Sequence, residues 1–167
     1  ADGPQVVAEA FVAAAENRVS IHQLFVTEDA LDKSADFVSA AQSLGAAIVI
    51  CDEPALSKIS GTQHPQGIVA VVGMPEPMFD VTNEKTRLIV ALDRISDPGN
   101  LGTIIRTAAA AGADAIVLSN GCVDPYNDKC VRSSTGSIFH IPVLEDVDLA
   151  ETARDCASAG VQVFAAD

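Results

Sequence analysis

The 167-residue sequence has little of several patterns on which common protein functions depend. It contains no CxxC pair, which argues against a zinc site, and we expect no metal. No apolar run approaches the ~20 residues of a membrane-spanning helix. No GxGxxG fingerprint or Walker loop is present, which argues against a nucleotide-binding α/β enzyme such as a dehydrogenase. The cysteines are expected to be reduced thiols in a cytoplasmic protein: Cys51, Cys122, Cys130 and Cys156.

Positive charge is also scarce. Lys and Arg number 10 against 23 Asp and Glu, and the formal net charge is −13. An acidic surface repels a polyanion unless Lys and Arg gather locally, so charge alone argues against a nucleic-acid partner. Six of the ten basic residues fall in the middle of the chain: Lys85, Arg87, Arg94, Arg106, Lys129 and Arg132. The sequence therefore allows a local basic face without showing that these side chains converge.

The sequence does carry alternating helix and strand patterns, and its 49% hydrophobic content is enough for a core. In the first part, helices are predicted over 3–17, 31–44 and 53–59, and strands over 21–26, 47–51 and 66–72. These elements predict a small α/β domain over residues 1–73. The Pro-rich and polar stretch that follows is predicted to be a linker over 74–86.

The last part of the chain repeats the alternation and is predicted to be a second domain over 87–167. Its near-continuous apolar strands between helices predict a parallel sheet covered on both faces. Strands are predicted over 88–92, 115–119, 141–144 and 161–165. Helices are predicted over 101–111, over most of 127–139, and over 149–159.

The stretch 93–107 joins a predicted strand, a dense turn and a predicted helix start. Such junctions are where open α/β sheets place ligands. Asn100 is a good N-cap for a helix that begins at Leu101. Arg106 lies off the apolar face of that helix. Spacing alone favours a capping Asn and a solvated Arg over a functional pair, and both interpretations stay open on this evidence.

Three runs in this region closely resemble the first motif of the SpoU/TrmH family of RNA ribose methyltransferases: DPGNLG at 97–102, IRTA at 105–108 and AGA at 111–113. Lys129, RSSTGSIF at 132–139 and IPV at 141–143 resemble the segment that follows in that family. More loosely, residues 3–10 and 65–71 resemble the family's accessory substrate-binding domain. The resemblance implies an L30e-like α/β domain followed by a SPOUT domain, which is Rossmann-like, built on a parallel sheet and normally trefoil-knotted.

The resemblance also implies an activity, the transfer of a methyl group from S-adenosylmethionine to a ribose 2′-hydroxyl of RNA. 23S ribosomal RNA is the favoured substrate and a homodimer the favoured assembly. Asn100 and Arg106 would be catalytic. The contacts to RNA would come from Arg94, Lys129, Arg132 and Ser134. The pKa of a guanidinium lies above about 12, so the group keeps its proton. We therefore expect Arg106 to stabilise the developing alkoxide. A role for it as the base stays open.

Two family motifs are not found in these 167 residues, a Gly-Asn-Glu-x-x-Gly loop and a Ser-Leu-Asn-Val-Ser loop. We therefore expect the SPOUT domain to be truncated before its knot and to lack most of the cofactor site. Ala165, Ala166 and Asp167 would reach the edge of the cofactor. The alternatives are an RNA-binding module without catalysis, a transfer RNA methylase, and a thiostrepton-type resistance methylase. Lys129 and Arg132, three apart on one helix face, fit an RNA contact and a solvated face equally well.

Overall fold

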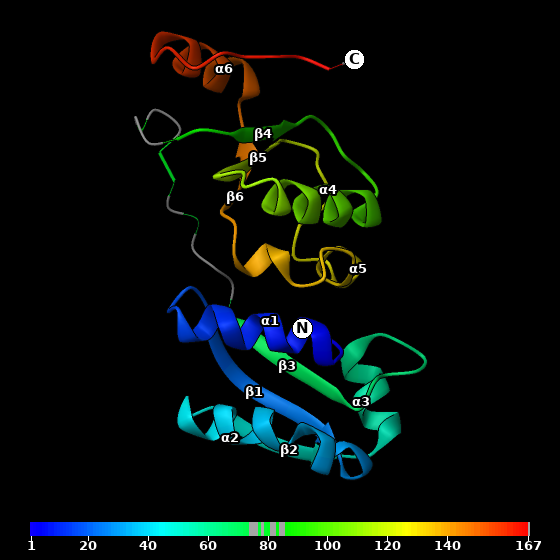
Figure 1. The fold of residues 1–167 in the computed structure, drawn as a ribbon. Helices are drawn as coiled ribbons and strands as arrows, with labels where there is room; N and C mark the ends of the chain where they lie inside the picture. The colour runs from blue at the N-terminus through cyan, green and yellow to red at the C-terminus, as the bar shows by residue number, and fades with distance from the viewer. Residues whose placement is uncertain (74–76, 78, 81–82, 84–85, 167) are drawn as a thin grey trace.

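A computed structural model describes residues 1–73, 77, 79–80, 83 and 86–166. The chain forms two three-stranded sheets with their helices, which we call the first unit (residues 1–73) and the second unit (residues 86–166) (Figure 1). Most of the predicted linker 74–86 lies outside the described residues. Within the described part of the chain, no helix combines the length and apolar character needed to cross a membrane.

In the first unit the sheet order is β2-β1-β3, with β1 parallel to β2 and antiparallel to β3. Helices α1 and α2 pack on each other through Phe11 and Phe37, whose ring centroids are 5.7 Å apart. The elements are α1 (Pro4–Ala15), β1 (Ser20–Thr27), α2 (Ala35–Ser43), β2 (Ala47–Cys51), α3 (Glu53–Ser60) and β3 (Ile68–Gly73). The helix predicted over 31–44 is shorter than expected, because two 3₁₀ turns, Glu28–Ala30 and Asp32–Ser34, precede α2.

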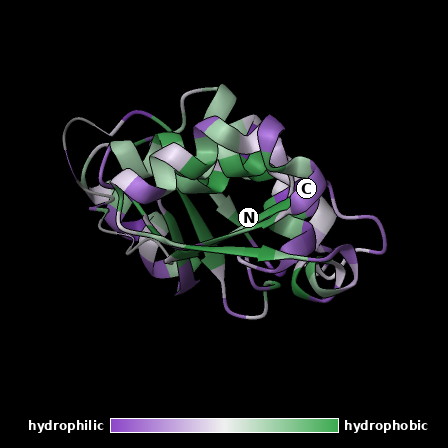
Figure 2. Cartoon of the chain, turned by 90° about the horizontal axis from the view of Figure 1, so that it is seen from below, coloured by the Kyte–Doolittle hydropathy of each residue, from purple (hydrophilic) through white to green (hydrophobic). Residues whose placement is uncertain are grey.

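The second unit contains the predicted parallel sheet, in the order β4-β5-β6. Its central strand is buried at Ala115, Ile116, Val117 and Leu118. Figure 2 shows strands of the chain coloured mostly as hydrophobic. The elements are β4 (Ile89–Leu92), α4 (Pro98–Ala110), β5 (Ala115–Ser119), α5 (Asp128–Ser133), the 3₁₀ turn η3 (Ser137–Phe139), β6 (Val143–Val147) and α6 (Leu149–Ser158).

One predicted element of this unit is confirmed with an interruption, and one is wrong. Most of 127–139 is helical as expected, in α5 and η3, and Thr135 and Gly136, with positive φ values of 54° and 83°, separate the two. The strand expected over 161–165 is absent. Among the described residues this segment pairs with no strand, and its Val161 N–H instead donates to Cys156 O at the end of α6 (2.8 Å). Phe164 is 85% exposed, so the apolar composition that suggested a strand is not buried.

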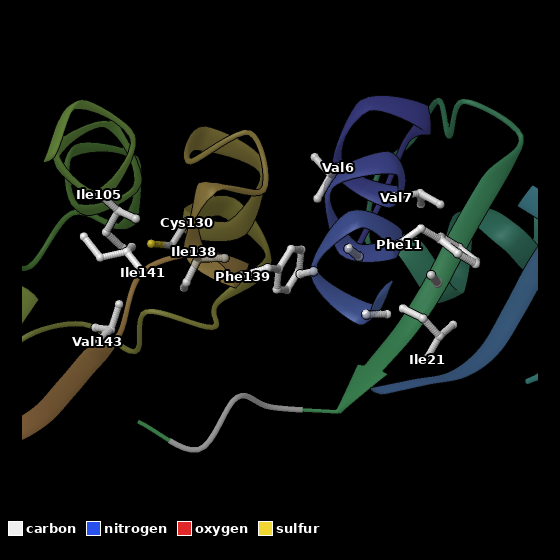
Figure 3. Packing of buried hydrophobic residues seen from close by; sticks show 14 of the residues in the cluster. Val6, Val7, Phe11, Ile21, Ile105, Cys130, Ile138, Phe139, Ile141 and Val143 are labelled. Carbon is white, nitrogen blue, oxygen red and sulfur yellow. The ribbon is translucent and has the colours of Figure 1, made fainter. Parts of the chain in front are cut away.

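The two units share one hydrophobic cluster, in which α1 is the connecting element. Figure 3 shows Phe139 lying toward the side of α1 that carries Val6, whereas Val7 and Phe11 point toward the first sheet. Polar contacts border this packing. His140 Nε2 lies 3.0 Å from Glu9 Oε2, and Arg18 donates to the carbonyl oxygen of His140 (2.9 Å).

Candidate functional site

The loops that follow β4 and β5 meet at the carboxyl edge of the parallel sheet. Asp93 Oδ1 accepts a hydrogen bond from Ser119 Oγ (2.8 Å), and Asp93 Oδ2 accepts from Arg94. The backbone N–H of Arg94 donates to Ser119 Oγ (2.9 Å). These bonds hold the pKa of Asp93 below its usual range, first through Ser119 and then through Arg94. The two loops are therefore fixed to each other where the sheet would face a ligand.

The first turn of α4 is held by Asp97. Its Oδ1 accepts from the backbone N–H of Asn100 (2.8 Å), so Asp97 is the N-cap and the helix begins at Pro98. The prediction of Asn100 as the cap is wrong. Asn100 lies inside the helix and its side chain is exposed. The Asp97 carboxylate also pairs with Lys129 Nζ on α5 (3.0 Å), and this bond is the main reason that the pKa of Asp97 is lowered.

Helices α4 and α5 pack closely because Gly102 has no side chain. A Cβ at this position would overlap the carbonyl oxygen of Cys130 and lie 2.7 Å from Ser133 Cβ. Burial raises the pKa of the Cys130 thiol at this contact to about 12, so the thiol stays neutral. The close approach brings the polar side chains of the α5 segment to the edge of α4.

Arg106 is exposed on α4, and its guanidinium reaches the α5 segment. Its Nη1 donates to Thr135 Oγ1 at 3.5 Å, near the outer limit for a hydrogen bond. Gly99 lies seven residues earlier on the same helix face, and the side chain of Lys129 lies over it, with Cε 3.2 Å from where a Gly99 Cβ would be. Lys129 and Arg106 therefore border the same side of α4, about two turns apart.

The four predicted RNA-binding residues lie in different surroundings. Arg94 and Lys129 are exposed, with side-chain exposures of 76% and 56%. Arg132 instead turns toward the first unit, where its Nη1 lies 3.7 Å from Asp2 Oδ2 and makes no hydrogen bond. Ser134 is fully buried and donates to Val131 O (2.8 Å), which leaves it no exposed atom for RNA. Lys129 and Arg132 were expected to act from one helix face, but they pair with different carboxylates, Asp97 and Asp2.

The residues predicted to lie at the edge of the cofactor follow α6. Ala165 and Ala166 are exposed, and a methyl side chain cannot donate or accept a hydrogen bond; Asp167 lies outside the described residues. The nearby groove of about 690 Å³ is lined by β4, α6 and residues 159–164. Within the described part of the chain, no cluster of three or more His, Cys, Asp or Glu residues could hold a metal ion.

Sequence reasoning missed two residues that hold the predicted catalytic residues in place. Asp97 accepts a hydrogen bond from the backbone of Asn100, and Thr135 accepts one from Arg106. The role of Asp97 as a helix cap could have been predicted from the sequence, because an Asp directly before a Pro is a strong helix-start pattern. The role of Thr135 depends on a positive φ value and on a contact between α4 and a segment 29 residues later. No local pattern encodes that contact.

Comparison with known proteins identifies both parts of the chain. Residues 87–167 match the model of the SpoU rRNA Methylase family. Residues 3–78 match the model described as RNA 2'-O ribose methyltransferase substrate binding. The RlmP protein of Bacillus subtilis, a 23S rRNA (guanosine(2553)-2'-O)-methyltransferase, is 44% identical over 112 residues, which make up 67% of this chain and 43% of that protein.

Solved structures agree with these matches. An AdoMet-bound rRNA methyltransferase from Sinorhizobium meliloti superposes with a TM-score of 0.74 and 30% identity, over 95% of this chain and 57% of that chain. The SpoU methyltransferase AviRb from Streptomyces viridochromogenes superposes with a TM-score of 0.72 and 28% identity, over 96% of this chain and 58% of that chain. The present chain spans less than half the length of RlmP and somewhat more than half of these structures.

Proposed function

Because this chain belongs to the SpoU rRNA methylase family, we propose that it acts in the transfer of a methyl group from S-adenosylmethionine to a ribose 2′-hydroxyl of 23S ribosomal RNA. The observation that carries the proposal is the placement of Arg106 and Lys129 on one side of α4, the helix that follows the first strand of the parallel sheet. Two cations there can bind adjacent phosphates of an RNA strand on a protein that is otherwise acidic.

In this proposal Arg106 acts on the RNA. A ribose hydroxyl is a poor nucleophile until its oxygen becomes more negative. A guanidinium that stays protonated can bind the neighbouring phosphate and stabilise the developing alkoxide. Asn100, exposed in the first turn of α4, would orient the ribose. S-adenosylmethionine supplies the methyl group.

The same proposal assigns a separate role to each part of the chain. Residues 1–73 would bind substrate RNA, residues 74–86 would link the two domains, and residues 87–167 would belong to the methyltransferase domain. The matched ranges 3–78 and 87–167 support this division. Cytoplasmic location and assembly as a homodimer complete the proposal. The four free cysteines are in keeping with a reducing compartment.

The test is an Arg106→Ala variant of the complete gene product. Transfer of labelled methyl groups to 23S ribosomal RNA should fall by well over tenfold, the equivalent of ~1.4 kcal/mol of barrier, while calorimetry detects unchanged binding of S-adenosylmethionine. Arg106→Lys should also be poor, because one ammonium cannot reproduce a planar fork of donors. Arg154→Ala is a matched control on α6, where the guanidinium donates to Ala150 O of its own helix. Turnover of Arg106→Ala within tenfold of the parent would rule out this role.

A second candidate is RNA binding without catalysis, favoured by the exposure of Ala165 and Ala166, whose methyl side chains cannot donate or accept a hydrogen bond. Titration of S-adenosylmethionine into the 167-residue chain separates the two. The absence of binding, together with retained affinity for 23S ribosomal RNA, would favour the binding module for this chain. One-to-one binding would favour the enzyme.

A further inference from the structure

We propose that Thr135 is a positioning residue for Arg106, and that α1 of the first unit holds Thr135 in place. This proposal rests on the proposed function, since it assigns a partner to the arginine that acts on the RNA. The geometry joins three elements, because α1 contacts the turn at 134–136 and the turn contacts α4.

The first step is the conformation of Thr135. Its φ of 54° lies in the left-handed region, which a β-branched side chain rarely adopts. Such a conformation persists where the surroundings determine it, and it is common at functional sites. Here it directs the Thr135 hydroxyl to Arg106 Nη1 across 29 residues of sequence. At 3.5 Å the contact limits the range of the guanidinium without locking it.

The second step is the restraint on the turn. Gly136 is buried against α1, and a Cβ on it would lie 2.5 Å from Glu9 Cβ and 3.6 Å from the carbonyl oxygen of Val6. The Glu9 carboxylate also pairs with His140 (3.0 Å), just after η3. On the other side, Ser134 is fully buried and bonded to Val131 O. Thr135 is thus fixed between two anchored neighbours.

The consequence is a connection between the two units. Arg106 is on α4 of the second unit, yet the residue that limits its motion depends on α1 of the first unit. Exposed long side chains lose considerable rotamer freedom when they bind. A guanidinium already restrained toward one position loses less of that freedom when RNA arrives.

The first test uses nuclear magnetic resonance and needs no turnover. Arginine labelled with ¹⁵N reports the order of each side-chain Nε–H group. Thr135→Val, which removes the hydroxyl and keeps the shape, should lower the order parameter of Arg106 to below about 0.6, the range of flexible groups. Thr135→Ser should keep the parental value. Arg154 on α6 should not change in any variant. An unchanged Arg106 in Thr135→Val would overturn the proposal.

Two further variants cover the remaining outcomes. If Thr135→Val does not fold, Thr135→Gly removes the hydroxyl and accepts the positive φ, so it should give the same loss of order at Arg106. Glu9→Ala removes the pairing with His140 and should lower the order of Arg106 by a smaller amount. If Glu9→Ala leaves Arg106 as it was, the part assigned to α1 is wrong. Thr152→Val on α6 is the matched control for the Thr→Val change.

The second test is kinetic and uses the complete gene product. Thr135→Val should lower kcat for RNA methylation by roughly tenfold, which equals ~1.4 kcal/mol, with little change in the KM for S-adenosylmethionine. Thr135→Ser should restore kcat. If the parent protein methylates no RNA, the proposed function fails, whereas the spectroscopic result still decides the role of Thr135. If Thr135→Val changes only KM, positioning of Arg106 is excluded.

Discussion

At the scale of single residues, Gly102 decides how closely α4 and α5 approach. A helix interior normally favours Ala over Gly by about 1 kcal/mol. Here a Cβ would meet backbone and side-chain atoms of α5, at 2.7 Å from Ser133 Cβ and 2.9 Å from Ser134 N. The helices would have to separate to accept it, because none of these atoms is the end of a flexible side chain.

Gly102→Ala should therefore destabilise the protein by about 1–3 kcal/mol, the usual cost of overpacking. Urea unfolding followed by circular dichroism measures this difference. Thr103→Ala, on the exposed side of the same helix, is the control and should be neutral or slightly stabilising. A Gly102→Ala protein as stable as its parent would mean that α4 and α5 are less tightly packed than described.

At the scale of elements, Asp97 joins α4 to α5 as cap and as ion-pair partner. Asp97→Asn isolates the second role, because Asn caps a helix about as well as Asp. The pKa of Asp97 is below its ordinary value of 3.8, so its charge stabilises the fold above that pH and the contribution is lost as pH falls through the folded value. Asp97→Asn should be less stable than the parent at neutral pH.

The difference between the two proteins should close once the pH falls below the lowered pKa of Asp97, because both then carry a neutral side chain. Urea unfolding across this pH range gives the measurement. A difference that stays constant with pH would show that the pairing of Asp97 with Lys129 contributes nothing through charge.

The elements also show how far sequence reasoning reaches. The strands at 47–51 and 115–119 have the predicted bounds, because an apolar run with a turn at each end encodes them locally. The start of α4 was misplaced, because Asp97 competes with Asn100 for the same cap. The prediction of a strand at 161–165 was wrong, because a strand must pair with a neighbouring strand and apolar composition does not specify that neighbour. Asn100 and Arg106 were singled out by resemblance, whereas Thr135 depends on tertiary contact.

At the scale of the whole molecule, charge and packing each connect the two units. The net charge is −13, so RNA affinity must come from the few exposed cations. Lys129→Gln should weaken RNA binding and reduce the slope of log K against log salt by about 0.7–0.9. Arg154→Gln, on α6 of the second unit, is the control and should leave the slope unchanged, because its guanidinium donates to Ala150 O of its own helix. Fluorescence anisotropy over a range of salt concentrations tests both. Equal slopes for Lys129→Gln and the parent would exclude a phosphate contact.

Packing between the units depends on Phe139, which is 6% exposed and lies against α1 (Figure 3). Because both units contribute to one hydrophobic cluster, we expect the parent to unfold in a single transition. Phe139→Ala should cost about 3–5 kcal/mol and divide unfolding into two transitions. Calorimetry measures both effects. Phe164→Ala, at a site that is 85% exposed, should change neither. A single transition in Phe139→Ala would mean that the units are coupled elsewhere.

The contact of α1 with the turn at 134–140 also sets an order of events during synthesis. Glu9 and His140 are separated by 131 residues. At ~5–20 residues per second, a ribosome needs about 7–26 seconds to make the intervening chain. Over that interval the nascent first unit can close its own sheet, but the side of α1 that carries Val6 stays uncovered. That side of α1 is covered only once the segment that carries Phe139 has been made.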